Sequence, residues 1–95
     1  DPKVQAFVKE YTTSFGQKPG AMAALGYDGL LVMANALKNA ASLSHSDIQA
    51  SLVATKGFVG ITGAITIDAN RNARKSAVVL ETTAAGNIFK QKVNP

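Results

Sequence analysis

Apolar residues near the start of the chain recur at steps of three and four. Between residues 3 and 16 they form one stripe, made of Val4, Phe7, Val8, Tyr11 and Phe15. This spacing places them on a single face of a helix, and the charged residues of the segment lie off that face. We therefore predict a helix over residues 3–16, with Gly16 as its stop signal.

Two further helices are predicted from composition and capping signals. Residues 20–42 are rich in Ala, Leu and Met, which favour helix, and from Ala21 to Ala34 apolar residues occur on every side. A helix that is apolar all round is typically buried, so we expect this one to lie against other polypeptide. Residues 45–55 form a shorter helix, whose N-cap is either Ser44, with Asp47 three positions later, or Ser46.

The remainder of the chain has the alternating pattern of strands. We predict strands over residues 58–67, 76–83 and 87–93. The polar cluster at 68–72 predicts a hairpin between the first strand and the apolar run that follows. Gly86 or Asn87 can supply positive φ for a second turn.

Two features of these strands depart from a regular pattern. Residues 77–80 are apolar on both faces, which is typical of a central strand. Gly60 and Gly63 lie inside the first strand, where glycine usually marks a bulge, a bend or a close approach to the backbone.

The element order gives an α/β fold class, about three helices followed by about three strands. Ninety-five residues are enough for one small domain with a thin core. The chain has no cysteine, so no disulfide or thiolate metal site supplements that core. An apolar content of 46% with 17% charged residues is typical of a globular protein rather than a disordered one.

The net charge of +4 is spread along the chain. Its densest points are Arg71, Arg74 and Lys75, followed by Lys90 and Lys92. A nucleic-acid surface concentrates charge on one face and adds stacking aromatics, so we expect no nucleic-acid partner. A small basic α+β interaction or nucleic-acid-binding module that self-associates is the alternative class.

The sequence contains no recognisable catalytic or cofactor site. His45 is the only histidine and lies in a Ser-rich segment, whereas a metal site needs three or four ligands. No nucleophile has a base and an orienting group beside it, and no glycine pattern matches a phosphate loop. We therefore expect a chain that is not an enzyme and that holds neither metal nor cofactor.

Asp28 is an unusual residue for its place in the pattern. It interrupts the apolar stretch from Ala21 to Met33, which is also too short for a membrane span of about 18 to 20 residues. A buried carboxylate requires hydrogen-bonding partners. In the first interpretation Asp28 faces outward or accepts hydrogen bonds from a neighbouring segment or a loop N–H; in the second it contacts a ligand.

An ordered series of short motifs resembles the closing part of the branched-chain amino-acid-binding proteins, which are extracytoplasmic solute receptors of ABC importers with the type I periplasmic-binding-protein fold. The series is Phe15-Gly16-x-x-Pro19, Ala24-Leu25-Gly26-Tyr27-Asp28-Gly29, Ala36-Leu37, Ile48 to Leu52, Gly57-Phe58-x-Gly60-x-Thr62-Gly63-x-Ile65-Thr66-Ile67-Asp68 and Gly86-Asn87-Ile88-Phe89. No single motif is specific, but their order covers nearly the whole chain. The family usually has a glycine near Arg71 or Asn72, and here Asn72 is the residue best suited to a left-handed conformation.

The resemblance implies that residues 1–95 are a C-terminal fragment of a two-lobed receptor, and the start of the chain at Asp1-Pro2 fits an internal piece or a processed form. It implies a periplasmic or extracytoplasmic location. The implied partners are the membrane permease of an ABC importer and a small solute such as an amino acid, which would bind only with the rest of the receptor. In a family of this fold the fragment completes the lobe that contains the N-terminus and then crosses towards the other lobe. In the fragment alone, the uncovered apolar surfaces are expected either to be covered by another copy, through self-association, or to stay exposed.

Met22 is the one candidate ligand-binding residue. The resemblance places the start of the helix over residues 20–42 at the mouth of the cleft, where relatives that bind leucine-like solutes have an apolar side chain, often aromatic. Met22 lies five residues before Tyr27 and is apolar and adaptable. The groups that hold the ammonium and carboxylate of an amino acid lie elsewhere in the family, so the chain alone is expected not to bind one.

Overall fold

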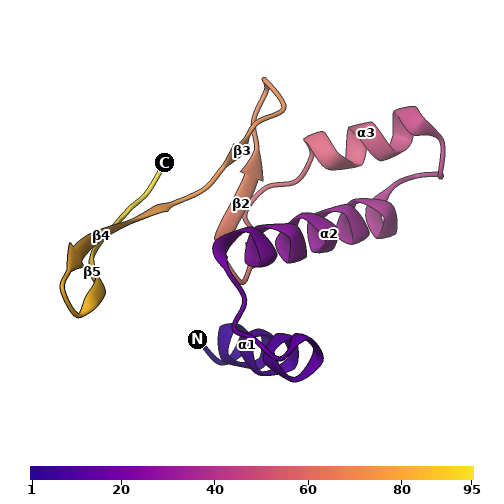
Figure 1. Cartoon of the computed structure of the whole chain (residues 1–95). Coiled ribbons are helices and arrows are strands. Elements are labelled where there is room, and N and C mark those ends of the chain that lie inside the picture. Colours follow the sequence, from indigo (N-terminus) through magenta and orange to yellow (C-terminus); the bar gives the residue numbers. More distant parts are fainter.

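Three helices precede five strands in the computed structural model, which describes residues 1–95 (Figure 1). The helices are α1 (Pro2–Phe15), α2 (Ala21–Asn39) and α3 (His45–Val53). The strands are β1 (Phe58–Gly60), β2 (Gly63–Ile67), β3 (Ala73–Arg74), β4 (Ala77–Thr83) and β5 (Gly86–Val93). The predicted α/β class and the three predicted helices are confirmed, and the helix ends differ from the prediction by at most three residues.

Local signals in the sequence fix the helix ends. The Asp1 side chain accepts a hydrogen bond from the Lys3 N–H at 2.8 Å, and Pro2 occupies the first turn of α1, where its missing N–H costs nothing. Gly16 ends α1 with φ of 70°. Ser44 caps α3 by accepting from the Asp47 N–H at 3.2 Å, so the first of the two predicted caps is the one that forms.

Helices α1 to α3 and strands β1 to β3 are called the body of the molecule here, and α2 is the element against which the rest of the body packs. Its buried residues, Asp28, Val32 and Ala36, recur at steps of four and therefore share one face. Ala36 is fully buried, and its small side chain lets α3 approach closely enough for the Ser51 hydroxyl to donate to the Ala36 carbonyl at 2.7 Å. On the other side, Phe7 of α1 packs on Tyr27 with ring centroids 4.7 Å apart.

The prediction of one strand over residues 58–67 is wrong. The segment is a hairpin in which β1 pairs with β2, Phe58 opposite Ile65 and Gly60 opposite Gly63, so that Ile61 and Thr62 form a two-residue turn. The two glycines that looked irregular within a strand mark the ends of this turn. The signal was therefore present in the sequence as a Gly-x-x-Gly spacing.

The polar cluster after β2 forms the second turn, as predicted. Asp68 organises it by accepting hydrogen bonds at its carboxylate from the N–H groups of Asn70 and Asn72. The left-handed residue is Arg71, with φ of 66°, so the prediction of Asn72 for this position is wrong. Asn72 instead donates its N–H to the Asp68 side chain. The strand that returns is short, because β3 comprises only Ala73 and Arg74.

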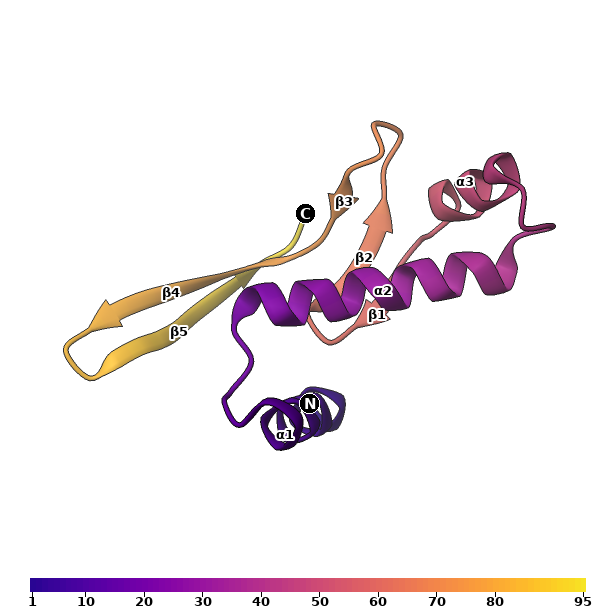
Figure 2. The same ribbon diagram turned by 45° about the vertical axis from the view of Figure 1, so that its right-hand side comes forward.

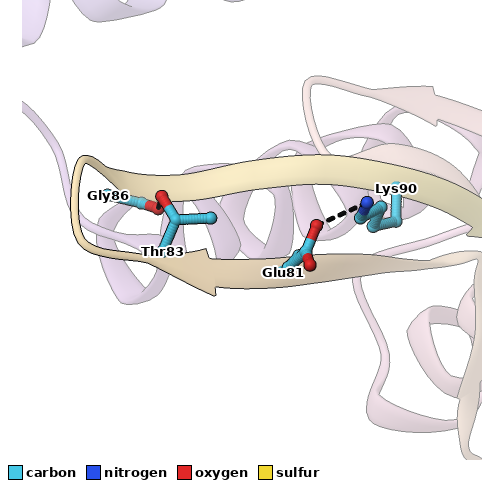
Figure 3. Close-up of polar contacts among 4 residues, drawn as sticks. All are labelled: Glu81, Thr83, Gly86 and Lys90. Atoms are coloured by element: carbon cyan, nitrogen blue, oxygen red, sulfur yellow. Dashed lines mark hydrogen bonds and ion pairs between the residues drawn. The ribbon is translucent and has the colours of Figure 1, made fainter.

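Strands β4 and β5 form a separate two-stranded sheet. Figure 3 shows the contacts within it, an ion pair between Glu81 and Lys90 and a hydrogen bond from the Thr83 hydroxyl to the Gly86 carbonyl. Gly86 has φ of 119°, as predicted for this turn. The prediction of a central strand at residues 77–80 is wrong for this chain, because β4 has a single partner and its residues up to Thr82 are exposed.

The chain as a whole is extended. The β4–β5 hairpin points away from the helices and is joined to them by one segment after β3 (Figure 2). The radius of gyration is 15.7 Å, whereas a compact chain of this length is expected near 12–13 Å. Only seven of the 95 residues are buried, so most of the apolar face of α2 and both faces of the hairpin are open to solvent. Within these 95 residues α2 is covered on one face only, and the further polypeptide expected from the sequence against its other faces is not among them.

Candidate functional site

The Asp28 carboxylate is the centre of a polar cluster that joins three separate segments of the chain. It lies on the buried face of α2 with 1% of its surface exposed, and it points at the turn between β1 and β2. The Ile61 N–H donates to Oδ1 and the Thr62 N–H donates to Oδ2, each at 2.8 Å, and the Thr62 hydroxyl also donates to Oδ2. Both carboxylate oxygens are thus engaged by the turn.

Gly60 makes room for this carboxylate. A Cβ atom added at residue 60 would lie 2.4 Å from Oδ2 and 2.5 Å from Oδ1 of Asp28, closer than real Cβ atoms come to any neighbour. The residue has no positive φ, so its requirement for glycine comes from contact and not from backbone conformation. Gly60 therefore sets how closely α2 can approach the hairpin.

Lys75 completes the cluster from the segment after β3. Its ammonium group donates to the Thr62 hydroxyl oxygen, and the Thr62 hydroxyl in turn donates to Asp28. Burial raises the pKa of the Asp28 carboxyl, but the hydrogen bonds from Thr62 and Ile61 and the positive charge of Lys75 outweigh burial, so its pKa is lower than usual. The carboxylate is accordingly held in its charged form.

These contacts decide between the two interpretations of Asp28. The interpretation in which it accepts from a loop N–H is confirmed, because two loop N–H groups occupy its oxygens. Thr62 and Lys75 were not identified as partners from the sequence. The Gly60–Gly63 spacing could have indicated a tight turn there, but nothing in the sequence paired that turn with a residue more than thirty positions earlier.

Met22, the predicted ligand contact, lies in the first turn of α2, with 81% of its surface exposed. It lies six residues before Asp28 and does not line the apolar crevice between α1, α2 and β1. That crevice has a volume of about 450 Å³ and lies between α1, α2 and β1, with Phe7, Tyr27, Leu31, Phe58 and Ile61 among its walls. Lys3 and Glu10 of α1 also line this crevice, so its wall carries one charge of each sign beside the apolar residues.

The remaining candidate groups form no second site. His45 is exposed at the first position of α3. No group of three or more His, Cys, Asp or Glu side chains is arranged to hold a metal ion. None of the three helices combines the length and the apolar character needed to span a membrane.

The fold and the sequence together identify the family of this chain. The chain is an α/β unit with an exposed apolar helix and an outlying hairpin. Its sequence matches the family model described as periplasmic binding protein over residues 1–87. The chain belongs to the periplasmic binding protein family, whose members are solute-binding receptors rather than enzymes.

Solved structures give the same result. The chain is 35% identical to the leucine-binding protein LivK of Thermotoga maritima, with a TM-score of 0.82 over 100% of this chain and 27% of that protein. It is 32% identical to the branched-chain amino-acid-binding protein LivJ of Streptococcus pneumoniae, solved in complex with isoleucine, with a TM-score of 0.81 over 100% of this chain and 27% of that protein.

A putative branched-chain amino-acid transporter protein of Rhodospirillum rubrum is 28% identical, with a TM-score of 0.79 over 95% of this chain and 27% of that protein. A comparison with curated protein sequences gives no significant match. The family resemblance and the type I fold read from the motifs are confirmed. The chain spans 27% of the length of each of these solved relatives.

Proposed function

We propose that this chain is the closing segment of an extracytoplasmic receptor that delivers branched-chain or related amino acids to an ABC importer. The observation that carries the proposal is the match of the whole chain, at a TM-score of 0.82 and 35% identity, to a leucine-binding protein. The relatives are a leucine-binding protein and a protein solved with isoleucine, which makes apolar amino acids the favoured solute class. The receptor's other partner would be the permease of the importer.

The separation of the β4–β5 hairpin from the rest of the chain supports a role in two lobes. Helices α1 to α3 and strands β1 to β3 would complete one lobe, and the β4–β5 hairpin would reach towards the other. The apolar residues exposed on both parts would then be covered by the remainder of the receptor; they include Leu25, Leu30, Met33, Val78, Leu80 and Phe89. Such a receptor closes on its solute by a hinge motion.

Met22 is assigned to the solute pocket of that receptor. Its exposed position at the start of α2 leaves the side chain free to contact a ligand, and its thioether adapts to branched aliphatic groups. The ammonium and carboxylate of the solute would be held by groups outside these 95 residues. The isolated chain is therefore proposed to lack ligand competence.

The test replaces the matched segment of the Thermotoga maritima leucine-binding protein with residues 1–95. Isothermal titration calorimetry of the chimera with leucine is expected to show binding, and the isolated chain is expected to show none. A chimera that folds, by circular dichroism, but binds no leucine, isoleucine or valine would contradict the proposal. Micromolar binding by the isolated chain would contradict its stated lack of competence.

The role of Met22 is tested in the same chimera. Met22→Ala removes an apolar contact worth about 1.5 kcal/mol, so leucine affinity should fall about tenfold. Lys38→Ala, at the opposite end of α2, serves as the control and should leave affinity unchanged. Equal affinities for the chimera and its Met22→Ala variant would remove Met22 from the site.

A further inference from the structure

The segment between β3 and β4 consists of Lys75 and Ser76. Lys75 is hydrogen-bonded to the β1–β2 turn, and Ser76 packs against Gly63 of β2. The Lys75 ammonium donates to the Thr62 hydroxyl, which donates to the buried Asp28 carboxylate. Each of these groups comes from a different part of the chain: α2, the β1–β2 turn and the segment that leads to the hairpin. A continuous polar chain therefore runs from the centre of α2 to the base of β4.

Ser76 contacts the β1–β2 hairpin by packing. Its hydroxyl oxygen lies 3.3 Å from the position that a Cβ atom at residue 63 would occupy, so it packs closely over the Gly63 backbone. Gly63 has φ of 114°, a conformation that favours glycine. Lys75 and Ser76 are both half-buried, whereas the residues on either side of them, Arg74 and Ala77, are exposed.

We propose that Lys75 and Ser76 form an anchored joint that fixes the direction in which the β4–β5 hairpin leaves the body. The hairpin forms its sheet with no other strand, and Figure 2 shows it projecting from this segment alone. Its orientation must then be set where the segment meets the body. Asp28, Thr62 and Lys75 are positioning residues: they hold the joint and need not touch a solute.

The role of this joint in the receptor rests on the proposed function, in which the body and the hairpin belong to different lobes. Motion between the lobes would take place beyond Ser76, while residues up to Ser76 would move with α2. A receptor that closes by a hinge needs such a fixed point, because a flexible joint would leave the relative orientation of the two lobes undefined.

The experiment measures the direction of the hairpin in the full 95-residue chain without any solute. The chain has no native cysteine, so spin labels can be attached at Lys38→Cys in α2 and Val78→Cys in β4. The labelled chain is diluted into an excess of unlabelled chain, so that only distances within one copy are measured. Double electron–electron resonance should then give one narrow distance peak for the otherwise unchanged chain. Lys75→Met and Thr62→Val should each replace that peak with a broad distribution, and Thr62→Ser, which keeps the hydroxyl, should restore it.

Lys90→Met is the matched control, because it removes a lysine from an ion pair inside the hairpin and leaves the joint intact (Figure 3). Its peak should stay narrow. A broad distribution in the unchanged chain, or a narrow one in Lys75→Met with the helix content preserved by circular dichroism, would overturn the proposal. The measurement uses no ligand, so its failure is distinct from a failure of leucine binding by the chimera.

Discussion

At the scale of single residues, the fold depends on the carboxylate of Asp28 and on the absence of a side chain at Gly60. Asp28 accepts from two turn N–H groups and a hydroxyl, and Gly60 leaves the space that this carboxylate fills. A buried charge is tolerated when its hydrogen bonds are complete, and an incomplete set costs about 1–3 kcal/mol per orphaned group. Substitutions here should therefore have large effects for their size.

Gly60→Ala should destabilise the chain strongly. The added methyl group would stand 2.4 Å from the Asp28 Oδ2 atom, so either the carboxylate or the turn must move. We expect a loss of about 2–4 kcal/mol in the free energy of unfolding, measured by urea titration followed by circular dichroism. Gly26→Ala is the matched control: it lies in α2 with open space around it, and alanine there should stabilise by up to about 1 kcal/mol. Equal effects of the two substitutions would contradict the contact argument.

Asp28→Asn should remove a pH-dependent part of the stability. Asparagine offers one oxygen, so its amide NH₂ would face a turn N–H, and we expect a loss of about 2 kcal/mol at pH 7. Because the folded-state pKa of Asp28 is lowered, its stabilising contribution is complete above the unfolded-state pKa of about 4.

That contribution is then lost as the pH falls through the folded-state pKa. The difference in unfolding free energy between the original chain and Asp28→Asn should therefore shrink between pH 5 and the most acidic pH at which both remain folded. Urea titrations at stepped pH values provide the measurement. A difference that stays constant across this range would show that the charge of Asp28 is not what stabilises the turn.

At the scale of elements, the sequence was a better guide to helices than to strands. The helices follow from a stripe at steps of three and four and from caps such as Asp1 and Ser44, all of which are local. The strand over 58–67 was mispredicted because alternation continues through the Ile61–Thr62 turn, and only the partner of each half reveals the reversal. The site was likewise out of reach, because Asp28 finds its donors over thirty residues away.

The two sheets should differ in local stability. Strands β1 and β2 are tied to α2 through Asp28, whereas the β4–β5 hairpin has only its own cross-strand contacts, and an isolated two-stranded hairpin is marginal in water. Backbone amides of β4 and β5 should exchange with deuterium at least about tenfold faster than those in the middle of α2. Exchange followed by NMR or mass spectrometry tests this, and equal protection would mean that the hairpin is stabilised by contacts beyond its own two strands.

At the scale of the whole molecule, the surface is too large for a self-contained domain. A compact 9.9 kDa monomer is expected to expose about 5,200 Å², and this chain exposes 7007 Å². The excess of about 1,800 Å² is similar to the area that a standard protein–protein interface buries. The exposed residues include 16 large hydrophobic side chains. The sequence indicated this from the all-round apolar character of α2, although it could not show which face stays buried.

Self-association should therefore increase as the chain concentration is raised. Light scattering during size exclusion is expected to give masses that rise above 9.9 kDa, because copies that meet can cover one another's apolar faces. Leu30→Glu, at a side chain 70% exposed on α2, should shift the chain towards the monomer by placing a charge in that face. Gln17→Glu adds the same charge in the exposed linker before α2 and should leave the mass unchanged, which separates the loss of an apolar contact from a change in net charge. A constant monomeric mass at all concentrations would mean that the open face of α2 is stable in water. That result would contradict the inference that this face packs against further polypeptide.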